Sequence, residues 1–98
     1  MTTLVGNQVT LVDKSGTITA GGSAQTAIAS NSLRRGFIIQ NNSSGNLWFS
    51  SMATAVQSQP SFLIQPGGYY ETPVHAVPTA TVSIIGPTTG QAFTAREW

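Results

Sequence analysis

Cysteine is absent from this 98-residue chain, and charged side chains are few. Without thiols the chain has no disulfide framework, no thiolate metal site and no cysteine nucleophile. Only 7% of the residues are charged, against about 25% in ordinary domains. The net charge is +1 and the only charge cluster is one pair of arginines, so the chain has no basic stripe for nucleic acid and none is expected as a partner.

Long apolar runs are also missing. No stretch approaches the roughly 18 apolar residues of a membrane-spanning helix, so no membrane partner is expected. The start of the chain, from Met1 to Leu4, lacks the charged and apolar regions of a secretory signal. We therefore expect synthesis in a cytoplasm. What the chain does contain is 24 Ser or Thr and 12 Asn or Gln, so its polar surface is built from hydroxyls and amides.

Short runs rich in Val, Ile and Thr alternate with Gly, Pro, Asn and Ser, which is the pattern of an all-β domain. The spacing leaves no room for a helix of about ten residues. We predict one small antiparallel β-sandwich or jelly-roll-like barrel of about seven to eight short strands. Residues 1–22 are expected to form an extended N-terminal arm or edge strands, and residues 23–98 the sandwich. The expected strands are 9–12, 17–20, 24–29, 37–41, 46–50, 61–65, 81–85 and 91–96.

Alternation along these strands predicts two faces. The inward face, and so the core, is predicted to contain Phe37, Ile39, Leu47, Phe49, Phe62, Ile64, Val82 and Ile84. The opposite face then carries four apolar residues, namely Ile38, Trp48, Leu63 and Ile85. Either a loop or the N-terminal segment covers them, or they form a subunit interface in a homo-oligomer, for which we expect a trimer.

Catalytic and metal-binding constellations are not recognisable in the sequence. The single histidine, His75, has one acidic residue nearby, Glu71, but no nucleophile elbow accompanies them. One His and three scattered carboxylates show no metal-ligand spacing. No glycine-rich segment is followed by Lys and Ser or Thr, as a phosphate loop requires. We therefore predict that the protein is not an enzyme and uses no cofactor and no metal.

Two features remain as candidates for binding. Arg34 and Arg35 either hold a partner's carboxylate or are solvated or paired with an acid of the same chain. Four aromatic residues either lie at the edge of a small core or form a platform on which a sugar stacks, namely Trp48, Tyr69, Tyr70 and Trp98. The candidate interface residues are thus Ile38, Trp48, Leu63, Ile85, Arg34, Arg35 and Trp98.

Three segments carry a resemblance to known proteins. They are Phe37-Ile-Ile-Gln-Asn-Asn-Ser-Ser-Gly-Asn-Leu-Trp-Phe49, Ile64-Gln-Pro-Gly-Gly-Tyr-Tyr-Glu71 and Val77-Pro-Thr-Ala-Thr-Val-Ser-Ile-Ile-Gly86. Residues 33–96 resemble a group of small virion proteins of tailed bacteriophages, encoded among head and tail genes. The resemblance lies in strand-turn-strand texture and not in catalytic residues. Some 30 residues precede the similar part.

The resemblance implies a non-enzymatic structural protein of the phage virion. A free-standing module of this size suits a capsid decoration (cement) protein, often a trimer, by analogy. Such a protein would stabilise the shell by packing between subunits of the major capsid protein on the outer surface of the head. The alternative is a tail- or fibre-associated module that recognises a glycan of the host surface. It requires Trp48, Tyr69 or Trp98 to line an open, concave site.

Overall fold

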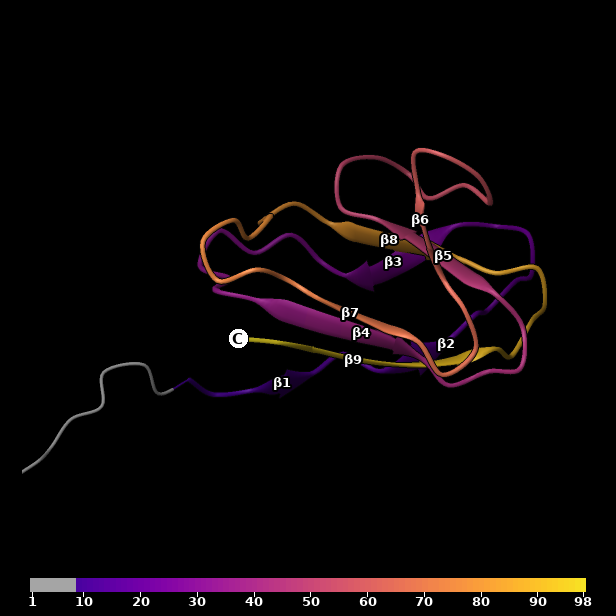
Figure 1. Ribbon diagram of the computed structural model, residues 1–98, viewed down its shortest axis with the longest axis horizontal. Coiled ribbons are helices and arrows are strands. Elements are labelled where there is room, and N and C mark those ends of the chain that lie inside the picture. The colour runs from indigo at the N-terminus through magenta and orange to yellow at the C-terminus, as the bar shows by residue number, and fades with distance from the viewer. Residues whose placement is uncertain (1–8) are drawn as a thin grey trace, which may run out of the picture.

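The computed structural model describes residues 9–98, which form nine β-strands and no helix (Figure 1). The prediction of an all-β, antiparallel sandwich is confirmed, since every strand pairs antiparallel with its neighbours in two sheets. The strands are β1 (Val12–Asp13), β2 (Gly16–Thr17), β3 (Gln25–Ile28), β4 (Phe37–Asn41), β5 (Leu47–Ser50), β6 (Phe62–Ile64), β7 (Tyr69–Glu71), β8 (Val82–Ile85) and β9 (Ala92–Glu97).

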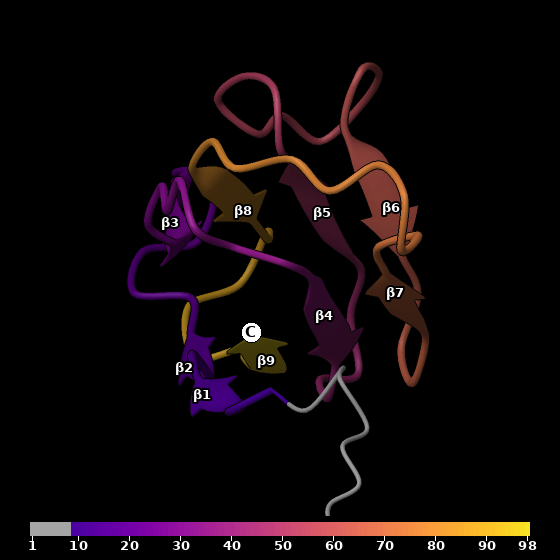
Figure 2. The same cartoon turned by 90° about the vertical axis from the view of Figure 1, so that its left-hand side faces the viewer.

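The two sheets pack face to face and are seen from the side in Figure 2. One has the order β1/β2–β9–β4–β7 and the other the order β3–β8–β5–β6. From β2 to β9 the chain changes sheet at every connection except that between β5 and β6. When β1 and β2 are counted as one strand, this is the order of an eight-stranded jelly roll.

β1 and β2 are two halves of one interrupted edge strand. Both pair with β9 in the same register, Asp13 lying opposite Arg96 and Gly16 opposite Phe93. At the interruption, the Ser15 hydroxyl accepts a hydrogen bond of 3.1 Å from the Ala95 N–H. Residues 12–17 are thus edge strands. Residues 1–8 of the expected arm lie outside the described part.

The core extends further toward the N-terminus than the expected boundary at residue 23. Ile18, only 1% exposed, belongs to it, together with Ile28, Phe93 and Ala95. Seven predicted core residues are confirmed there: Phe37, Ile39, Leu47, Phe49, Ile64, Val82 and Ile84. The prediction for Phe62 is wrong, since this side chain is 64% exposed. β6 is the last strand of its sheet, so no further strand covers Phe62.

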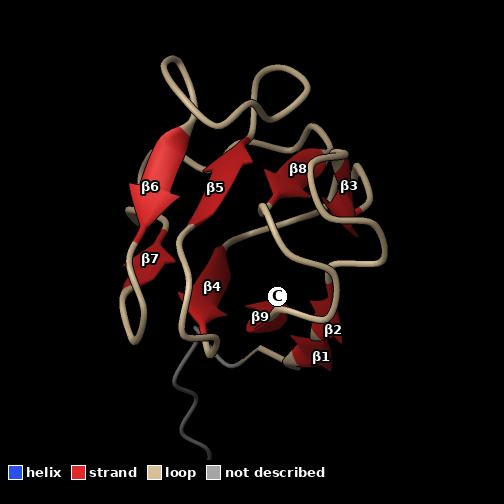
Figure 3. Ribbon diagram, turned by 90° about the vertical axis from the view of Figure 1, so that its right-hand side faces the viewer, coloured by secondary structure: helices blue, strands red, loops and turns tan. Residues whose placement is uncertain are grey.

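The connections between strands gather at two ends of the sandwich. We call one the turn end; it holds the short connections 18–24, 42–46, 65–68 and 86–91 and faces the viewer in Figure 3. The other is the loop end; it holds the longer connections 29–36 and 72–81, together with the last residue, Trp98, whereas the connection 51–61 lies over the outer side of the second sheet (Figure 1). Figure 2 looks onto the loop end.

Candidate functional site

Large apolar side chains are exposed at only some parts of the described surface. Within residues 9–98, none of the ten most exposed ones lies in the four connections of the turn end. They lie on β1 and the segment leading into it, on the loops of the loop end, on the connection 51–61, and on β6 and β7. They are Val9, Leu11, Val12, Leu33, Met52, Val56, Phe62, Leu63, Tyr69 and Val74. Apolar groups gathered on a surface mark sites of contact with other molecules.

A groove at the loop end combines apolar and basic side chains. We call it the loop-end groove; its lining residues are Val9, Arg34, Arg35, Val74, His75, Val77 and Trp98. It brings together three of the predicted interface residues, namely Arg34, Arg35 and Trp98. The sequence analysis missed the three valines. Two of them, Val74 and Val77, lie between Pro73 and Pro78. These prolines could have indicated a loop whose valines have no strand partner.

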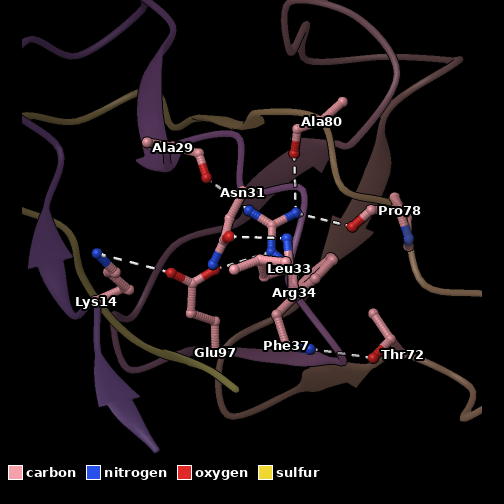
Figure 4. Close-up of polar contacts among 10 residues, drawn as sticks. All are labelled: Lys14, Ala29, Asn31, Leu33, Arg34, Phe37, Thr72, Pro78, Ala80 and Glu97. Carbon is pink, nitrogen blue, oxygen red and sulfur yellow. Dashed lines mark hydrogen bonds and ion pairs between the residues drawn. The ribbon is translucent and has the colours of Figure 1, made fainter.

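Arg34 lines this groove, and Figure 4 shows its contacts within the protein. It is 4% exposed, and its Nε donates to Glu97 Oε1 at 2.9 Å. Its two Nη atoms donate to three backbone oxygens, those of Ala29 at 2.6 Å, Pro78 at 2.8 Å and Ala80 at 2.9 Å. The guanidinium carbon lies 5.6 Å from the centre of the Phe37 ring.

These contacts correct the prediction that Arg34 belongs to an interface. Four of its five N–H donors are used within the chain and its side chain is buried, so it is not available to hold a partner's carboxylate with both nitrogens. It instead joins two loops of the loop end to β9. The Lys14 ammonium lies 3.8 Å from the other Glu97 oxygen and adds a second positive charge beside that carboxylate.

The turn before β4 separates the two arginines. The Asn31 side chain accepts a hydrogen bond from the Leu33 N–H, and the Asn31 carbonyl accepts one from the Arg34 N–H, both at 3.0 Å. This turn directs Arg34 into the protein, whereas Arg35 is exposed. Within residues 9–98, Arg35 makes no ion pair shorter than 4.0 Å.

Trp98 forms the wall of the groove next to Gly36. The Gly36 and Trp98 backbones bond to each other in both directions, at 3.0 and 3.1 Å. The indole lies so close to Gly36 that a Cβ atom there would come within 2.5 Å of the ring. Glycine at position 36 therefore leaves room for this half-buried indole next to the backbone.

The other predicted interface residues lie elsewhere and do not form one face. Trp48 lies between Ile85 and Leu63 in a cross-strand row on the outer side of the second sheet. In this row Leu63 is 41% exposed and Ile85 only 7%. Ile38 belongs to the other sheet, where Arg96 and Glu71 lie opposite it. The expectation of a single second apolar face is therefore wrong, because its four residues are divided between the two sheets.

The aromatic residues of the hypothetical sugar platform are also separated. Tyr70 points inward and packs on Phe37, Phe49 and Phe62, at ring-centre distances of 5.9, 5.0 and 6.2 Å. Its neighbour Tyr69 is 65% exposed and lies opposite Gln40. Of these four aromatic residues, Trp98 is the one that lines the loop-end groove.

Three further titratable residues are His75, Glu71 and Asp13. His75 and Glu71 are both exposed. In the described part of the chain, no three His, Asp or Glu residues lie close enough to hold a metal ion. No helix that could cross a membrane occurs in that part either. The pKa of Asp13 is lowered, because its carboxylate accepts hydrogen bonds from the Ser15 hydroxyl and N–H at 2.6 and 3.0 Å. These two residues lie at the β1–β2 interruption.

Comparisons with known proteins show a likeness in structure only. No family model matches the chain, and no curated protein matches it. Among solved structures, one chain from work entitled "Bacillus endospore appendages form a novel family of disulfide-linked pili" is similar. It is 15% identical with a TM-score of 0.49, over 99% of this chain and 93% of that chain. A likeness at this level does not extend to function.

Proposed function

We propose that this protein is a non-enzymatic structural protein of a tailed-phage virion, and specifically a capsid decoration (cement) protein. It would pack between subunits of the major capsid protein on the outer surface of the head, as a homo-oligomer. The observation that carries the proposal is the uneven distribution of exposed apolar residues, which include Leu33 and Val74 on loops of the loop end and are absent from the four connections of the turn end. The sequence resemblance described above supports it, and jelly rolls occur in capsid proteins, which supports it by analogy.

Attachment through the loop end would be apolar in character. Val74 and Leu33 are 93% and 82% exposed, and both lie on loops of this end. Burial of apolar surface contributes roughly 25 cal/mol per Å². Seven charged residues, of which Arg34 and Glu97 are buried, offer little electrostatic surface. Ion pairs between exposed charges weaken with salt. We therefore expect attachment to survive a rise in salt to about 1 M, which already screens charges beyond about 3 Å.

The experiment compares the two ends on particles that lack the protein. Val74→Asp places a charge on the loop end, and Thr88→Asp places the same charge at an exposed position of the turn end. Val74→Asp should reduce the number of bound copies at least tenfold, and Thr88→Asp should leave it unchanged. Equal binding of both variants, or release of the unaltered protein by salt alone, would contradict docking by the loop end. Images of particles should place the copies on the head with this end inward, and copies on the tail would contradict the decoration role.

One observation favours the alternative, a glycan-binding module on a tail or fibre. Trp98 lines a groove together with Arg35 and His75, and an aromatic ring beside polar donors is suited to a sugar. Binding to lipopolysaccharide from host cells tests it. Under this alternative, Trp98→Ala abolishes binding and Trp48→Ala does not. Absence of binding by the unaltered protein would contradict it.

A further inference from the structure

Two strands expose unpaired backbone at the same side of the sandwich (Figure 2). β6 ends one sheet, β7 ends the other, and the short connection 65–68 joins them. The free N–H and C=O groups of an edge strand form a template for another strand. Natural edges are usually protected by charged residues, bulges or a covering segment. An edge without such protection is open to pairing with another strand.

β6 is apolar on both of its faces and carries no charge. Phe62 points toward the space between the sheets, where its ring stacks on that of Tyr70 with 8° between the planes. Leu63 points to the outer side, next to Trp48. Phe62 and Leu63 are nevertheless 64% and 41% exposed. The nearest charged residue along the following chain is Glu71, in β7.

The segment that precedes β1 has matching chemistry. Its first eleven residues include no charged residue and no proline. Leu4 and Val5 are adjacent, so in a strand their side chains would point to opposite faces. Val9 and Leu11, which the structure describes, are 40% and 54% exposed, so this part is not covered by its own domain.

We propose that residues 1–8 of one copy add as a strand to β6 of a neighbouring copy. Of Leu4 and Val5, one covers Leu63 on the outer side and the other covers Phe62 at the opening between the sheets. The added strand takes up the free backbone groups of β6, as in strand addition by peptides. This inference deepens the homo-oligomer of the proposed function. It does not depend on the capsid.

Length and charge favour this occupant and this edge. Eight extended residues span about 26 Å, and the three residues of β6 occupy about 10 Å. About 16 Å then remains for crossing between copies. β7 is the poorer acceptor, because the exposed carboxylate of Glu71 would lose water beside an uncharged strand.

The contact joins two different surfaces of the chain, an N-terminal segment and an edge strand. Such a head-to-tail contact closes into a ring if the rotation between copies allows it, and otherwise continues as a filament. A closed ring of three would use every segment and every edge. This is the trimer expected from the sequence.

The test uses full-length chains in which one half of the contact is broken. Leu4→Asp with Val5→Asp breaks the segment and keeps the edge. Leu63→Lys breaks the edge and keeps the segment. Thr88→Lys, at the turn end, is the control. By light scattering after gel filtration, the unaltered protein and the control should be oligomers, and each broken variant a monomer with unchanged circular dichroism.

Mixing the two broken variants supplies the decisive result. One provides an intact edge and the other an intact segment, so the mixture should form a dimer. In ¹⁵N NMR spectra of the Leu4→Asp, Val5→Asp variant, a peptide of residues 1–11 should shift the amides of residues 62–64. A monomeric unaltered protein, a mixture that stays monomeric, or shifts confined to β7 would overturn the proposal. Unchanged particle binding by Val74→Asp would contradict docking by the loop end, but it would not bear on the strand contact, which these oligomer measurements test separately.

Discussion

The two ends of the sandwich are held together by different chemistry. At the turn end, the neutral amides of Asn41 and Gln91 tie the short connections. Asn41 donates to the backbone oxygens of Gly45 and Ile64, at 2.7 and 2.8 Å, and Gln91 donates to that of Asn46 at 3.1 Å. At the loop end, the charged Arg34 ties the connections together, because it donates hydrogen bonds to three backbone oxygens and to Glu97.

This difference explains how a domain with a small core can hold loops whose apolar side chains are exposed. Neutral amides suit short turns, because the backbone groups that need hydrogen-bond partners lie near one another in space and little charge is buried. The loop end instead concentrates its ties in one side chain, whose partners are up to 63 residues away in sequence. With the loops fixed from inside, their outer side chains need no contacts with the domain, and Leu33 and Val74 project into solvent.

Arg34→Ala should have the largest effect. It leaves the Glu97 carboxylate with only Lys14 at 3.8 Å and leaves three backbone oxygens without their donor. Removal of one partner of a buried ion pair costs about 3–5 kcal/mol. Urea denaturation measures this loss. Arg35→Ala is the matched control and should change stability by less than about 0.5 kcal/mol. Similar effects of the two variants would remove the distinction between the ends.

Asn41→Ala should come next, with a loss of about 1–3 kcal/mol, because the buried oxygen of Ile64 loses the Asn41 donor and the oxygen of Gly45 keeps only that of Ser43. Amide exchange should accelerate most around residues 42–46 and 65–68, at the turn end. Asn46→Ala, at an exposed side chain of the same connection, should have almost no effect. Faster exchange at the loop end as well would show that the two ends open together.

Gly36→Ala should have a smaller effect, about 1 kcal/mol, at the lower limit of overpacking changes. The new methyl group would displace the Trp98 indole, which is half-buried and can move outward. Tryptophan fluorescence should shift to longer wavelength. The shift should be absent from Gly36→Ala in a Trp98→Phe background, in which Trp48 is the remaining indole. A fluorescence spectrum that does not change would show that the indole does not lie against Gly36.

Asp13→Asn should have the smallest effect. Hydrogen bonds from Ser15 hold the pKa of Asp13 below its model-compound value of 3.8, so folding favours the charged carboxylate. This contribution is complete above that value and is lost as the pH falls through the lower pKa of the folded state. The unaltered protein should therefore be slightly more stable than Asp13→Asn at pH 7, and the difference should shrink below pH 3.8. A difference that grows in acid would contradict the sign.

Prediction from sequence succeeded where the pattern is local. Strict alternation places Phe37 and Ile39 inward, and the strand 37–41 appears with both predicted bounds. It failed where the position of a strand within a sheet decides burial. Phe62 has the same alternation, yet it is exposed because β6 is an edge strand. Ile18 was missed because it is a lone apolar residue among threonines.

The candidate site was predictable only in part, for the same reason. Arg34, Arg35 and Trp98 were identified as residues of interest, and the structure brings them to one groove. The burial of Arg34 could not be read from the sequence, since its acidic partner lies 63 residues away. Ile38 and Trp48 are separated because their strands, β4 and β5, belong to different sheets. Alternation within a strand does not indicate to which sheet that strand belongs.

The strand order also has a consequence for the route by which the protein folds. Within residues 9–98, β9 alone joins β1 and β2 to β4, so the first sheet cannot assemble until residues 92–97 have left the ribosome. Among the described strands, β5 and β6 alone are both consecutive and paired. The earliest structure should therefore be this single hairpin. Closure of the distant pairs then follows slowly, over about milliseconds to seconds, as in other β proteins dominated by non-local contacts.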